Sequence, residues 1–176
     1  MVEEVLCICN GSSKTGSHLL LKAVSLFYGH IGLPQHEHTP YFAKRDDRKY
    51  LHITRNPRNV LISWCRFMGI ELTDENLLEQ IPIIIDEMRE YVPWLGDTEV
   101  LNVKFEELLD DPKHLDRISE FINMPLVANH FENLWGRTYT FTGRLSDWRD
   151  YWSDELQESW VKFGGLKLEA DLGYRN

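Results

Sequence analysis

Residues 5–17 read Val-Leu-Cys-Ile-Cys-Asn-Gly-Ser-Ser-Lys-Thr-Gly-Ser, and this stretch decides the fold that the sequence predicts. Its apolar beginning continues a predicted strand over Val2–Cys9, and apolar residues recur at helical spacing over Ser17–Tyr28. The loop between them consists of small residues and one lysine. A strand, a small-residue loop and a helix N-terminus together point backbone N–H groups at an anion. The stretch therefore predicts a phosphate-binding loop.

The chemistry of this loop depends on Lys14, whose charge can reach a phosphate oxygen. Gly11 and Gly16 permit tight turns and a close approach of the backbone. Further donors are the hydroxyl groups of Ser12, Ser13, Thr15 and Ser17. The loop is not a Walker A motif, because its lysine precedes the second glycine instead of following it. The alternative without a ligand is an ordinary strand-to-helix turn in which Ser17 caps the helix.

Two further apolar segments, Tyr50–Thr54 and Glu99–Val103, predict buried strands that each precede a helical pattern. The expected helices span Pro57–Phe67, residues 73–91 with Thr73 as N-cap, Phe105–Leu109, Pro112–Ile122 and Asp154–Lys162. Alternating strands and helices predict an α/β fold, a three-layer sandwich around a central parallel sheet that is similar to P-loop nucleotide hydrolases. The absence of repeats and linkers predicts a single domain over residues 1–176.

A second candidate anion site follows the second predicted strand, where Arg55-Asn-Pro-Arg-Asn-Val-Leu-Ile-Ser63 begins a helix. An arginine at the end of the strand and a serine about two helical turns later can converge on one anion. The Arg55 guanidinium offers bidentate hydrogen bonds, and Ser63 adds a hydroxyl group. The alternative is an arginine that pairs with a structural carboxylate.

The charge distribution supports an anion site in the first part of the chain. The 176 residues contain 19 Lys and Arg against 28 Asp and Glu, which gives a net charge of −9. This total argues against duplex DNA and other nucleic acids as partners. However, residues 1–70 carry a balance of +4, while residues 71–120 carry −11. The acidic middle is expected to be a solvated helical surface, and its alternative role is to repel anionic acceptors or to contact a basic partner.

Both candidate sites resemble segments of sulfotransferases that use 3′-phosphoadenosine 5′-phosphosulfate (PAPS). Residues 13–18 are similar to the loop Pro-Lys-Ser-Gly-Thr-Thr that holds the 5′-phosphosulfate in that family. The resemblance implies that PAPS contacts Ser13, Lys14, Thr15, Gly16, Ser17 and His18. The segment from Arg55 to Ser63 has the order and spacing of the family's 3′-phosphate site. The chain resembles a short member of the family.

Two later segments extend this resemblance toward the C-terminus. Phe105 stands where the family places an aromatic residue against adenine, although a simple core phenylalanine is an equal alternative. The segment Gly143-Arg-Leu-Ser-Asp-Trp resembles the family's Gly-x-x-Gly-Asp-Trp. The basic pair that normally precedes it is replaced by Phe141 and Thr142, so the expectation is that Gly143 and Arg144 complete the 3′-phosphate site.

A base for the acceptor is expected between the first helix and the second strand that the pattern predicts, because the family places a histidine there. His38-Thr-Pro is the best match to the family's His-Leu-Pro, which makes His38 the predicted base, His36 the second choice and Glu37 a less favoured one. The alternatives for this histidine cluster are a metal site and plain surface polarity. His52, inside a predicted strand, is expected to be a hydrogen-bonded structural histidine.

The resemblance implies in-line transfer of the sulfuryl group from PAPS to a hydroxyl or amine, with Lys14 and His38 as catalytic residues and no metal. The acceptor is expected to be a small molecule or a glycan, and neither its identity nor the oligomeric state can be read from the residues. Tyr41, Phe42, Trp135, Tyr139 and Trp148 are candidates for an aromatic pocket. The alternatives are a binding module for PAPS or 3′,5′-ADP without activity, and an ATP- and magnesium-dependent P-loop phosphotransferase.

The cysteines and the apolar runs predict a compartment for the protein. Cys7 and Cys9 share one face of a predicted strand, and Cys65 is distant, so free buried thiols in a reducing compartment are expected. The first nine residues lack the basic start of a secretory signal, and no run has the length of a membrane span. The expected location is therefore the cytoplasm, without membrane contact.

Overall fold

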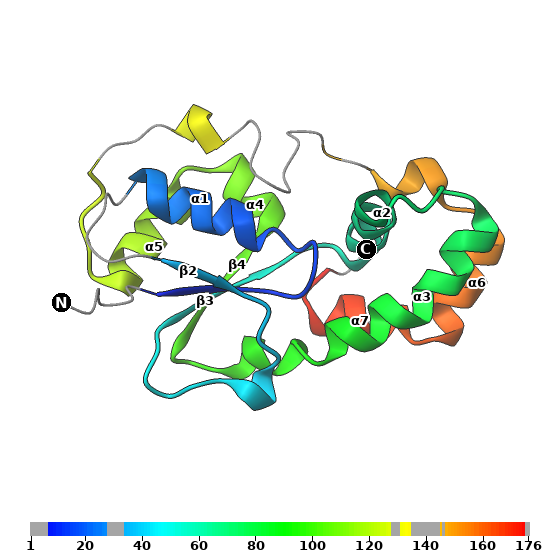
Figure 1. Ribbon diagram of the computed structural model, residues 1–176, viewed down its shortest axis with the longest axis horizontal. Coiled ribbons are helices and arrows are strands. Elements are labelled where there is room, and N and C mark those ends of the chain that lie inside the picture. The colour runs from blue at the N-terminus through cyan, green and yellow to red at the C-terminus, as the bar shows by residue number, and fades with distance from the viewer. Residues whose placement is uncertain (1–6, 28–33, 128–130, 135–144, 146, 175–176) are drawn as a thin grey trace.

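The computed structural model describes residues 7–27, 34–127, 131–134, 145 and 147–174. Its centre is a parallel sheet of four strands in the order β2-β1-β3-β4 (Figure 1). The strands are β1 (Ile8–Asn10), β2 (Gln35–Glu37), β3 (Tyr50–Thr54) and β4 (Val100–Lys104). The predicted α/β fold with a central parallel sheet is confirmed.

β2 is not among the strands that the sequence predicts, and the reason lies in its composition. Its three residues, Gln-His-Glu, are polar and lack the apolar alternation that marks a strand. β2 is the edge strand of the sheet, where one side needs no partner and short polar segments are tolerated. Tertiary pairing with β1 creates this strand, with His36 opposite Cys9.

One face of the sheet is covered by α1 (Ser17–Phe27), α4 (Phe105–Asp110) and α5 (Lys113–Ile122), as Figure 1 shows. Alternate residues of the strands point into this layer because successive side chains of a strand face opposite sides. The fully buried side chains on this face include Cys9, Leu51, Ile53, Leu19, Leu20, Leu108, Leu115 and Ile118. The segment η3 (Phe131–Leu134) adds the buried side chain of Leu134.

The opposite face packs on aromatic residues of η1 (Tyr41–Ala43) and of η2 (Val92–Gly96), and on Tyr91, which precedes η2. Trp94 is fully buried against Tyr50, with ring centroids 4.7 Å apart. His52 faces the same layer, and its ring stacks on Trp94 at 5.6 Å. Neither ring nitrogen of His52 has a hydrogen-bond partner among the described residues, so the prediction of a hydrogen-bonded histidine is wrong. Burial lowers its pKa to about 3, so its ring is neutral.

A second group of helices lies beyond the carboxyl ends of the strands and contains α2 (Pro57–Met68), α3 (Asp74–Arg89), α6 (Asp154–Lys162) and α7 (Gly165–Asp171) (Figure 1). The predicted N-cap is confirmed, since the Thr73 hydroxyl accepts the backbone N–H of Asn76. The boundaries of α6 are those predicted, whereas α7 was missed. Gly164, in the left-handed conformation, separates the two helices and permits the sharp turn between them.

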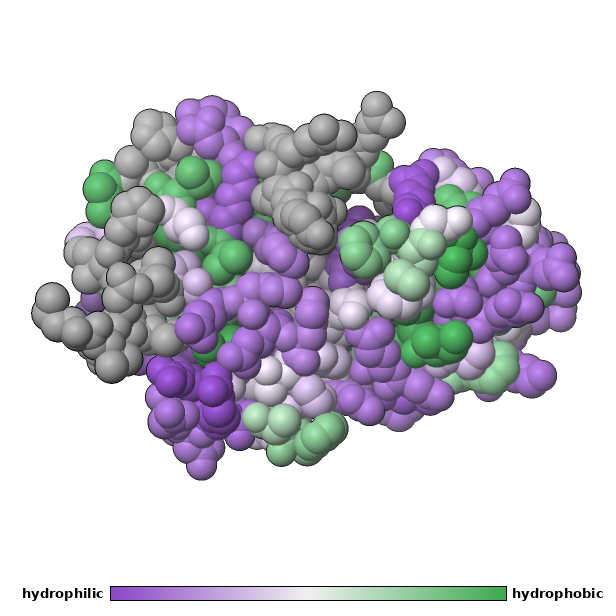
Figure 2. Space-filling model, in the orientation of Figure 1, coloured by the Kyte–Doolittle hydropathy of each residue, from purple (hydrophilic) through white to green (hydrophobic). Residues whose placement is uncertain are grey.

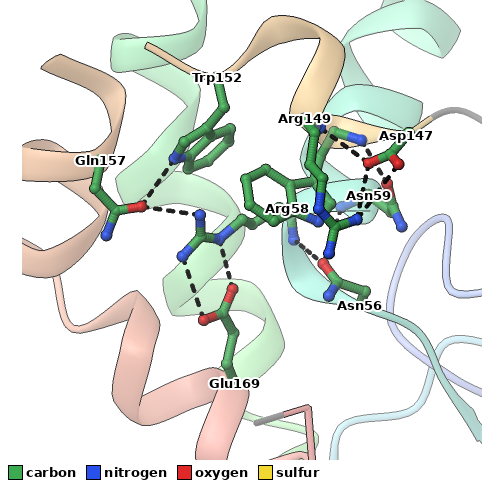
Figure 3. A network of polar contacts seen from close by, with 9 residues as sticks. Asn56, Arg58, Asn59, Asp147, Arg149, Trp152, Gln157 and Glu169 are labelled. Carbon is green, nitrogen blue, oxygen red and sulfur yellow. Dashed lines mark hydrogen bonds and ion pairs between the residues drawn. The ribbon is translucent and has the colours of Figure 1, made fainter. Parts of the chain in front are cut away.

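Arg58, in the first turn of α2, connects this helical group (Figure 3). Its Nε donates to Glu169 at 2.6 Å, and its Nη1 donates to Gln157 at 2.9 Å. The guanidinium also lies over the ring of Trp148, at 4.2 Å from the centroid. Because Arg58 is 2% exposed, its charge is balanced within the protein rather than by water. The start of α2, which follows Arg55, is thereby held by the C-terminal helices.

The described surface is mostly hydrophilic on the face shown in Figure 2, and its hydrophobic residues form small separate groups. In the part of the chain that the structure describes, no helix is long and apolar enough to cross a bilayer.

Candidate functional site

The phosphate loop lies at the carboxyl end of β1, where Lys14 adopts a left-handed backbone conformation with a φ of 65°. This conformation is uncommon for a residue with a side chain. It turns the Lys14 carbonyl toward Arg55, whose Nη1 donates to this oxygen at 3.3 Å. Arg55 follows the end of β3, the strand that pairs with β1. Parallel pairing therefore brings together the two cations that the sequence placed in separate motifs.

Gly16 and Gly11 are required by close packing around the loop. Gly16 has a φ of +108°, and a Cβ built there would lie 2.4 Å from a ring carbon of Phe105. A Cβ on Gly11 would lie 2.5 Å from Oγ1 of Thr15 and 2.8 Å from the carbonyl of Ile53. The Thr15 hydroxyl itself donates to the carbonyl of Ser12 at 2.8 Å. The Thr15 hydroxyl therefore stabilises the turn of the loop by a hydrogen bond within it.

Ser13 is held by a contact that the sequence analysis missed. Its backbone N–H donates to Oε1 of Glu87, a residue of α3, at 2.9 Å. The sulfotransferase loop has proline at this position, and proline carries no N–H. The replacement by serine therefore creates a donor that needs an acceptor, and Glu87 supplies it. The Ser13 hydroxyl, not its N–H, is the donor that this residue can offer to a ligand.

The electrostatics of Lys14 and Arg55 indicate an anion site. Burial lowers the pKa of Lys14, and the nearby charge of Arg55 lowers it further. Burial also lowers the pKa of Arg55, and its Nε is buried without a hydrogen-bond partner in the described part of the chain. Among the described residues, no carboxylate forms an ion pair with either cation within 4.0 Å. The charge of Glu106 partly offsets the effect of burial on Arg55, but it forms no ion pair with the guanidinium. An anion bound between Lys14 and Arg55 would reduce the repulsion between these two cations.

Two cavities flank these cations. The first has a volume of about 180 Å³ and lies beside the phosphate loop. It is lined by Ser13, Lys14, Gly16, Ser17, His18, His38, Trp64 and Phe67. The second has a volume of about 350 Å³ and contains Arg55 and Phe105 in its wall. Its other lining residues are Asn59, Glu106, Leu109, Asp110, Leu145, Asp147 and Arg149.

Ser63 lies on α2 between the residues that contribute to these two cavities. Asn59 lines the second cavity and Phe67 lines the first, and both are four residues from Ser63. Residues four apart lie on the same helix face, so the half-buried Ser63 belongs to the face that α2 turns toward both cavities. This position is compatible with the predicted role of Ser63 at a phosphate.

His38 has the geometry that a general base requires. Its Nδ1 lies 2.6 Å from the carbonyl of Gly11, and because a carbonyl only accepts, Nδ1 carries the hydrogen. In the neutral ring, Nε2 is then left with the lone pair that accepts a proton. His38 is exposed and lines the first cavity. The ring is thus oriented by the same loop that contains Lys14.

The other two candidates for the base are engaged elsewhere. His36 Nε2 lies 2.8 Å from Oγ of Ser17, and burial followed by the charges of His18 and His38 lowers the pKa of His36 to about 4. The Glu37 carboxylate pairs with Arg45 at 2.8 Å and accepts the Thr39 hydroxyl at 2.7 Å. His18 lines the cavity beside His38, and burial lowers its pKa.

The aromatic wall of the first cavity differs from the expected one. Trp64 and Phe67 of α2 line it, and the ammonium group of Lys14 lies 4.2 Å from the centroid of the Phe67 ring. These two aromatics are three residues apart just after Ser63, a spacing that could have been noticed on the predicted helix. Tyr41, Phe42 and Trp148 are not among the lining residues of that cavity, and Phe42 is 83% exposed. Trp135 and Tyr139 lie outside the described residues.

The C-terminal part of the predicted 3′-phosphate site is only partly described. Gly143 and Arg144 lie outside the described residues, as do Phe141 and Thr142. The second cavity instead contains Arg149, which the sequence analysis missed because it follows the motif tryptophan. The Arg149 guanidinium lies 3.1 Å from Asp147 and 4.8 Å from the centroid of the Trp148 ring.

Within the described ranges, no group of three or more His, Cys, Asp or Glu residues has a geometry that holds a metal ion. The expectation that no metal takes part stays a prediction.

No protein-family model matches the chain, and no curated protein matches its sequence. Solved structures do match. The crystal structure of mouse sulfotransferase SULT7A1 complexed with PAP aligns with a TM-score of 0.72 at 14% identity, over 96% of this chain and 84% of that chain. The fold is that of the sulfotransferases.

Retinol dehydratase, solved in complex with androsterone and inactive cofactor PAP, aligns with a TM-score of 0.59 at 17% identity. The alignment covers 92% of this chain and 59% of that chain, so the chain spans well under two thirds of that protein. The sulfotransferase fold that the two sequence motifs implied is therefore confirmed by structures that share little sequence with the chain.

Proposed function

We propose that the protein is a PAPS-dependent sulfotransferase that transfers the sulfuryl group to a hydroxyl or amine of a small-molecule or glycan acceptor. The observation that carries the proposal is the proximity of Lys14 and Arg55, which lie 41 residues apart: Nη1 of Arg55 donates to the backbone carbonyl of Lys14 at 3.3 Å, and the charge of Arg55 lowers the pKa of Lys14. Two cations of this kind at the ends of parallel strands suit a nucleotide with phosphates at both its 5′ and 3′ positions. The sulfotransferase fold supports the same ligand.

The residues present fit the 5′ end of PAPS. Lys14 and the hydroxyls of Ser13 and Ser17 line the first cavity beside a helix N-terminus, which favours an anion. Gly16 keeps the loop backbone close to Phe105 and leaves no room for a side chain. Thr15 and His18 complete the loop, the former by its internal hydrogen bond and the latter in the cavity wall.

The residues of the second cavity fit the 3′ end. Arg55 lines this cavity with an unpartnered buried Nε, and Ser63 lies on the adjoining face of α2. Phe105 supplies an aromatic surface for adenine while its ring also supports the Arg55 guanidinium, 4.4 Å from the centroid. Gly143 and Arg144 stay proposed members of this site, and Arg149 is a further cation for it.

PAPS supplies the sulfuryl group when it is bound. The chain's own contribution is electrostatic and acid–base chemistry. Lys14 and the loop amides stabilise the negative charge that develops on the bridging oxygen as the sulfur–oxygen bond breaks. His38, with Nδ1 donating to Gly11, accepts the proton of the acceptor at Nε2 as the acceptor oxygen or nitrogen attacks sulfur. Trp64 and Phe67 form the apolar wall beside this base.

The direct test is mass-shifted sulfonate transfer from PAPS to a panel of acceptors. Lys14→Ala should reduce turnover at least about a hundredfold, a loss typical of a removed electrostatic stabiliser. Lys113→Ala, which removes an exposed lysine of α5, is the matched control and should keep full turnover. Full turnover by Lys14→Ala would exclude the proposed catalytic role.

The same assays separate the alternatives. Binding of 3′,5′-ADP without transfer to any acceptor would identify a nucleotide-binding module. A preference for ATP with magnesium over 3′,5′-ADP in a thermal-shift experiment would identify a phosphotransferase and overturn the proposal.

We also propose that residues 1–176 form one domain and that the protein acts in the cytoplasm. The first proposal is supported by contacts between distant segments, such as the pair Arg58–Glu169. The second is supported by three free, buried thiols at Cys7, Cys9 and Cys65, which are typical of a reducing compartment.

A further inference from the structure

His36, in the middle of β2, lies against the last residue of the phosphate loop. Its Nε2 is 2.8 Å from Oγ of Ser17, which begins α1. Ser17 is 2% exposed but still contributes to the wall of the first cavity. The hydroxyl that faces the proposed 5′-phosphate position is therefore already in contact with a histidine.

The His36 ring is held in place by the surrounding structure. The rings of His18 and His38 both pack against it, with centroids 3.9 Å and 4.6 Å away. The strand that carries it pairs with β1, with His36 opposite Cys9. The segment that follows the strand is fixed by Asn10, whose side-chain amide donates to the Thr39 carbonyl at 3.0 Å and accepts the Thr39 N–H at 2.8 Å. Packing and backbone pairing thus set the position of His36 Nε2.

The direction of the hydrogen bond between His36 and Ser17 decides what Ser17 can do for a ligand. A serine hydroxyl has one proton and can accept further hydrogen bonds through its oxygen. If Ser17 donates to His36, that proton is unavailable to a ligand. If His36 donates to Ser17, the hydroxyl proton is free to turn toward the cavity. A phosphate oxygen only accepts, so the second arrangement is the productive one.

We infer that His36 is a positioning residue, which donates its Nε2–H to Ser17 Oγ and thereby turns the Ser17 hydroxyl proton toward the 5′-phosphate of the nucleotide. The inference rests on the proposed function. It distinguishes His36 from His38, which is oriented by Gly11 through Nδ1 and presents Nε2 as a base. His36 in β2 and His38 just after it then have opposite tautomers and different tasks.

The neutral state of His36 is consistent with this role. Its pKa of about 4 keeps the ring uncharged near neutral pH, so the contact with Ser17 acts through hydrogen-bond direction rather than charge. Burial lowers the pKa of both His36 and His18. The charges of His18 and His38 lower the pKa of His36 further, and those of His38 and Lys14 lower the pKa of His18 further, so protonation of either ring beside the loop is disfavoured.

The test compares two nucleotides, 3′,5′-ADP and adenosine 3′-phosphate, which differ in the 5′-phosphate. Calorimetry should show that His36→Phe, which keeps an aromatic ring without the donor, weakens 3′,5′-ADP binding about tenfold, the scale of a hydrogen bond to a charged group. Binding of adenosine 3′-phosphate should be unchanged. His36→Gln, whose amide N–H can replace Nε2–H, should restore most of the affinity.

Ser17→Ala provides a second, independent measurement. In that background His36→Phe should have no further effect on 3′,5′-ADP binding, because the hydroxyl that it orients is absent. Equal losses for both nucleotides, or an additive effect in the double variant, would show that His36 only supports the fold. A wild-type chain that binds neither nucleotide would overturn the proposed function itself, and this inference with it.

Discussion

Gly16 shows how closely the phosphate loop and the start of α4 approach each other. The loop needs a left-handed conformation at this position, and the Phe105 ring occupies the space that a side chain would take. The same ring lies against Arg55, so the loop, the aromatic ring and the arginine form one packed unit. A side chain introduced at Gly16 would displace the Phe105 ring and would therefore disturb both proposed phosphate sites.

We predict that Gly16→Ala lowers the free energy of unfolding by about 1–3 kcal/mol and abolishes 3′,5′-ADP binding, because backbone strain and a steric clash act together. Urea denaturation and calorimetry measure the two effects. Gly69→Ala is the matched control, since Gly69 also has a positive φ but would meet no atom within 4 Å. That variant should be less stable through strain alone, by about 1 kcal/mol, and should bind the nucleotide normally. Normal binding by Gly16→Ala would contradict the packing argument.

At the scale of the elements, α2 carries much of the site. Its first turn follows Arg55, its middle holds Ser63, and its last turns place Trp64 and Phe67 in the first cavity. The helix is capped by Asn56, whose side chain accepts the backbone N–H groups of Arg58 and Asn59. Arg58 joins the same end of α2 to α6 and α7 (Figure 3).

Replacing Arg58 by methionine should lower the free energy of unfolding by about 3–5 kcal/mol, because it leaves the buried Glu169 carboxylate without its partner. The measurement is urea denaturation followed by tryptophan fluorescence. Lys167→Met tests an exposed ion pair of α7 with Asp171 and should change the stability by less than about 1 kcal/mol. In an Arg58→Met/Glu169→Gln double variant the losses should not add, and simple additivity would show that the two side chains are not coupled.

β2 is the second element that matters for the site, although it is three residues long. The strand and the two residues that follow it make three side-chain connections to the region of the loop: His36 to Ser17, His38 to Gly11 and Thr39 to Asn10. An edge strand of low intrinsic strand propensity is here held by polar contacts. The proposed base and the proposed positioning residue thus depend on the docking of one short strand.

The whole molecule combines a negative net charge of −9 with a small cationic site. Lys14, Arg55 and Arg149 come from segments far apart in the chain, and the last two line one cavity. The acidic side chains of that cavity are partly engaged, since Glu106 accepts the N–H of Asn56 and the hydroxyl of Tyr174. The proposed anion site therefore depends on tertiary assembly rather than on composition.

Arg149→Ala should weaken 3′,5′-ADP binding about tenfold by removing one charged donor, while leaving the affinity for adenosine 5′-phosphate unchanged. Calorimetry with both nucleotides makes the comparison. Arg117→Ala, an exposed arginine of α5, serves as the control and should affect neither. If Arg149→Ala weakens both nucleotides equally, or neither, Arg149 does not contact the 3′-phosphate.

The helices and strands with the clearest local sequence patterns were the ones that the sequence predicted correctly. Buried strands β3 and β4 and helices α3 and α6 were predicted from their apolar patterns, and for α3 the Thr73 cap agrees with the pattern. β2 and α7 were missed because their formation depends on pairing and packing with distant segments. The prediction for His52 failed because hydrogen-bond satisfaction cannot be inferred from strand position.

The sequence by itself determined the α/β class and the sulfotransferase resemblance, and it proposed the phosphate loop around Lys14 and the Arg55–Ser63 segment, since each depends on residues close together in the chain. Only the tertiary structure decided that Lys14 and Arg55 meet, that Nδ1 of His38 is bound by Gly11, and that Trp64, Phe67 and Arg149 line the cavities. The physical reason is that contacts across parallel strands and between layers join residues from 27 to 111 positions apart, and no local pattern encodes such distances.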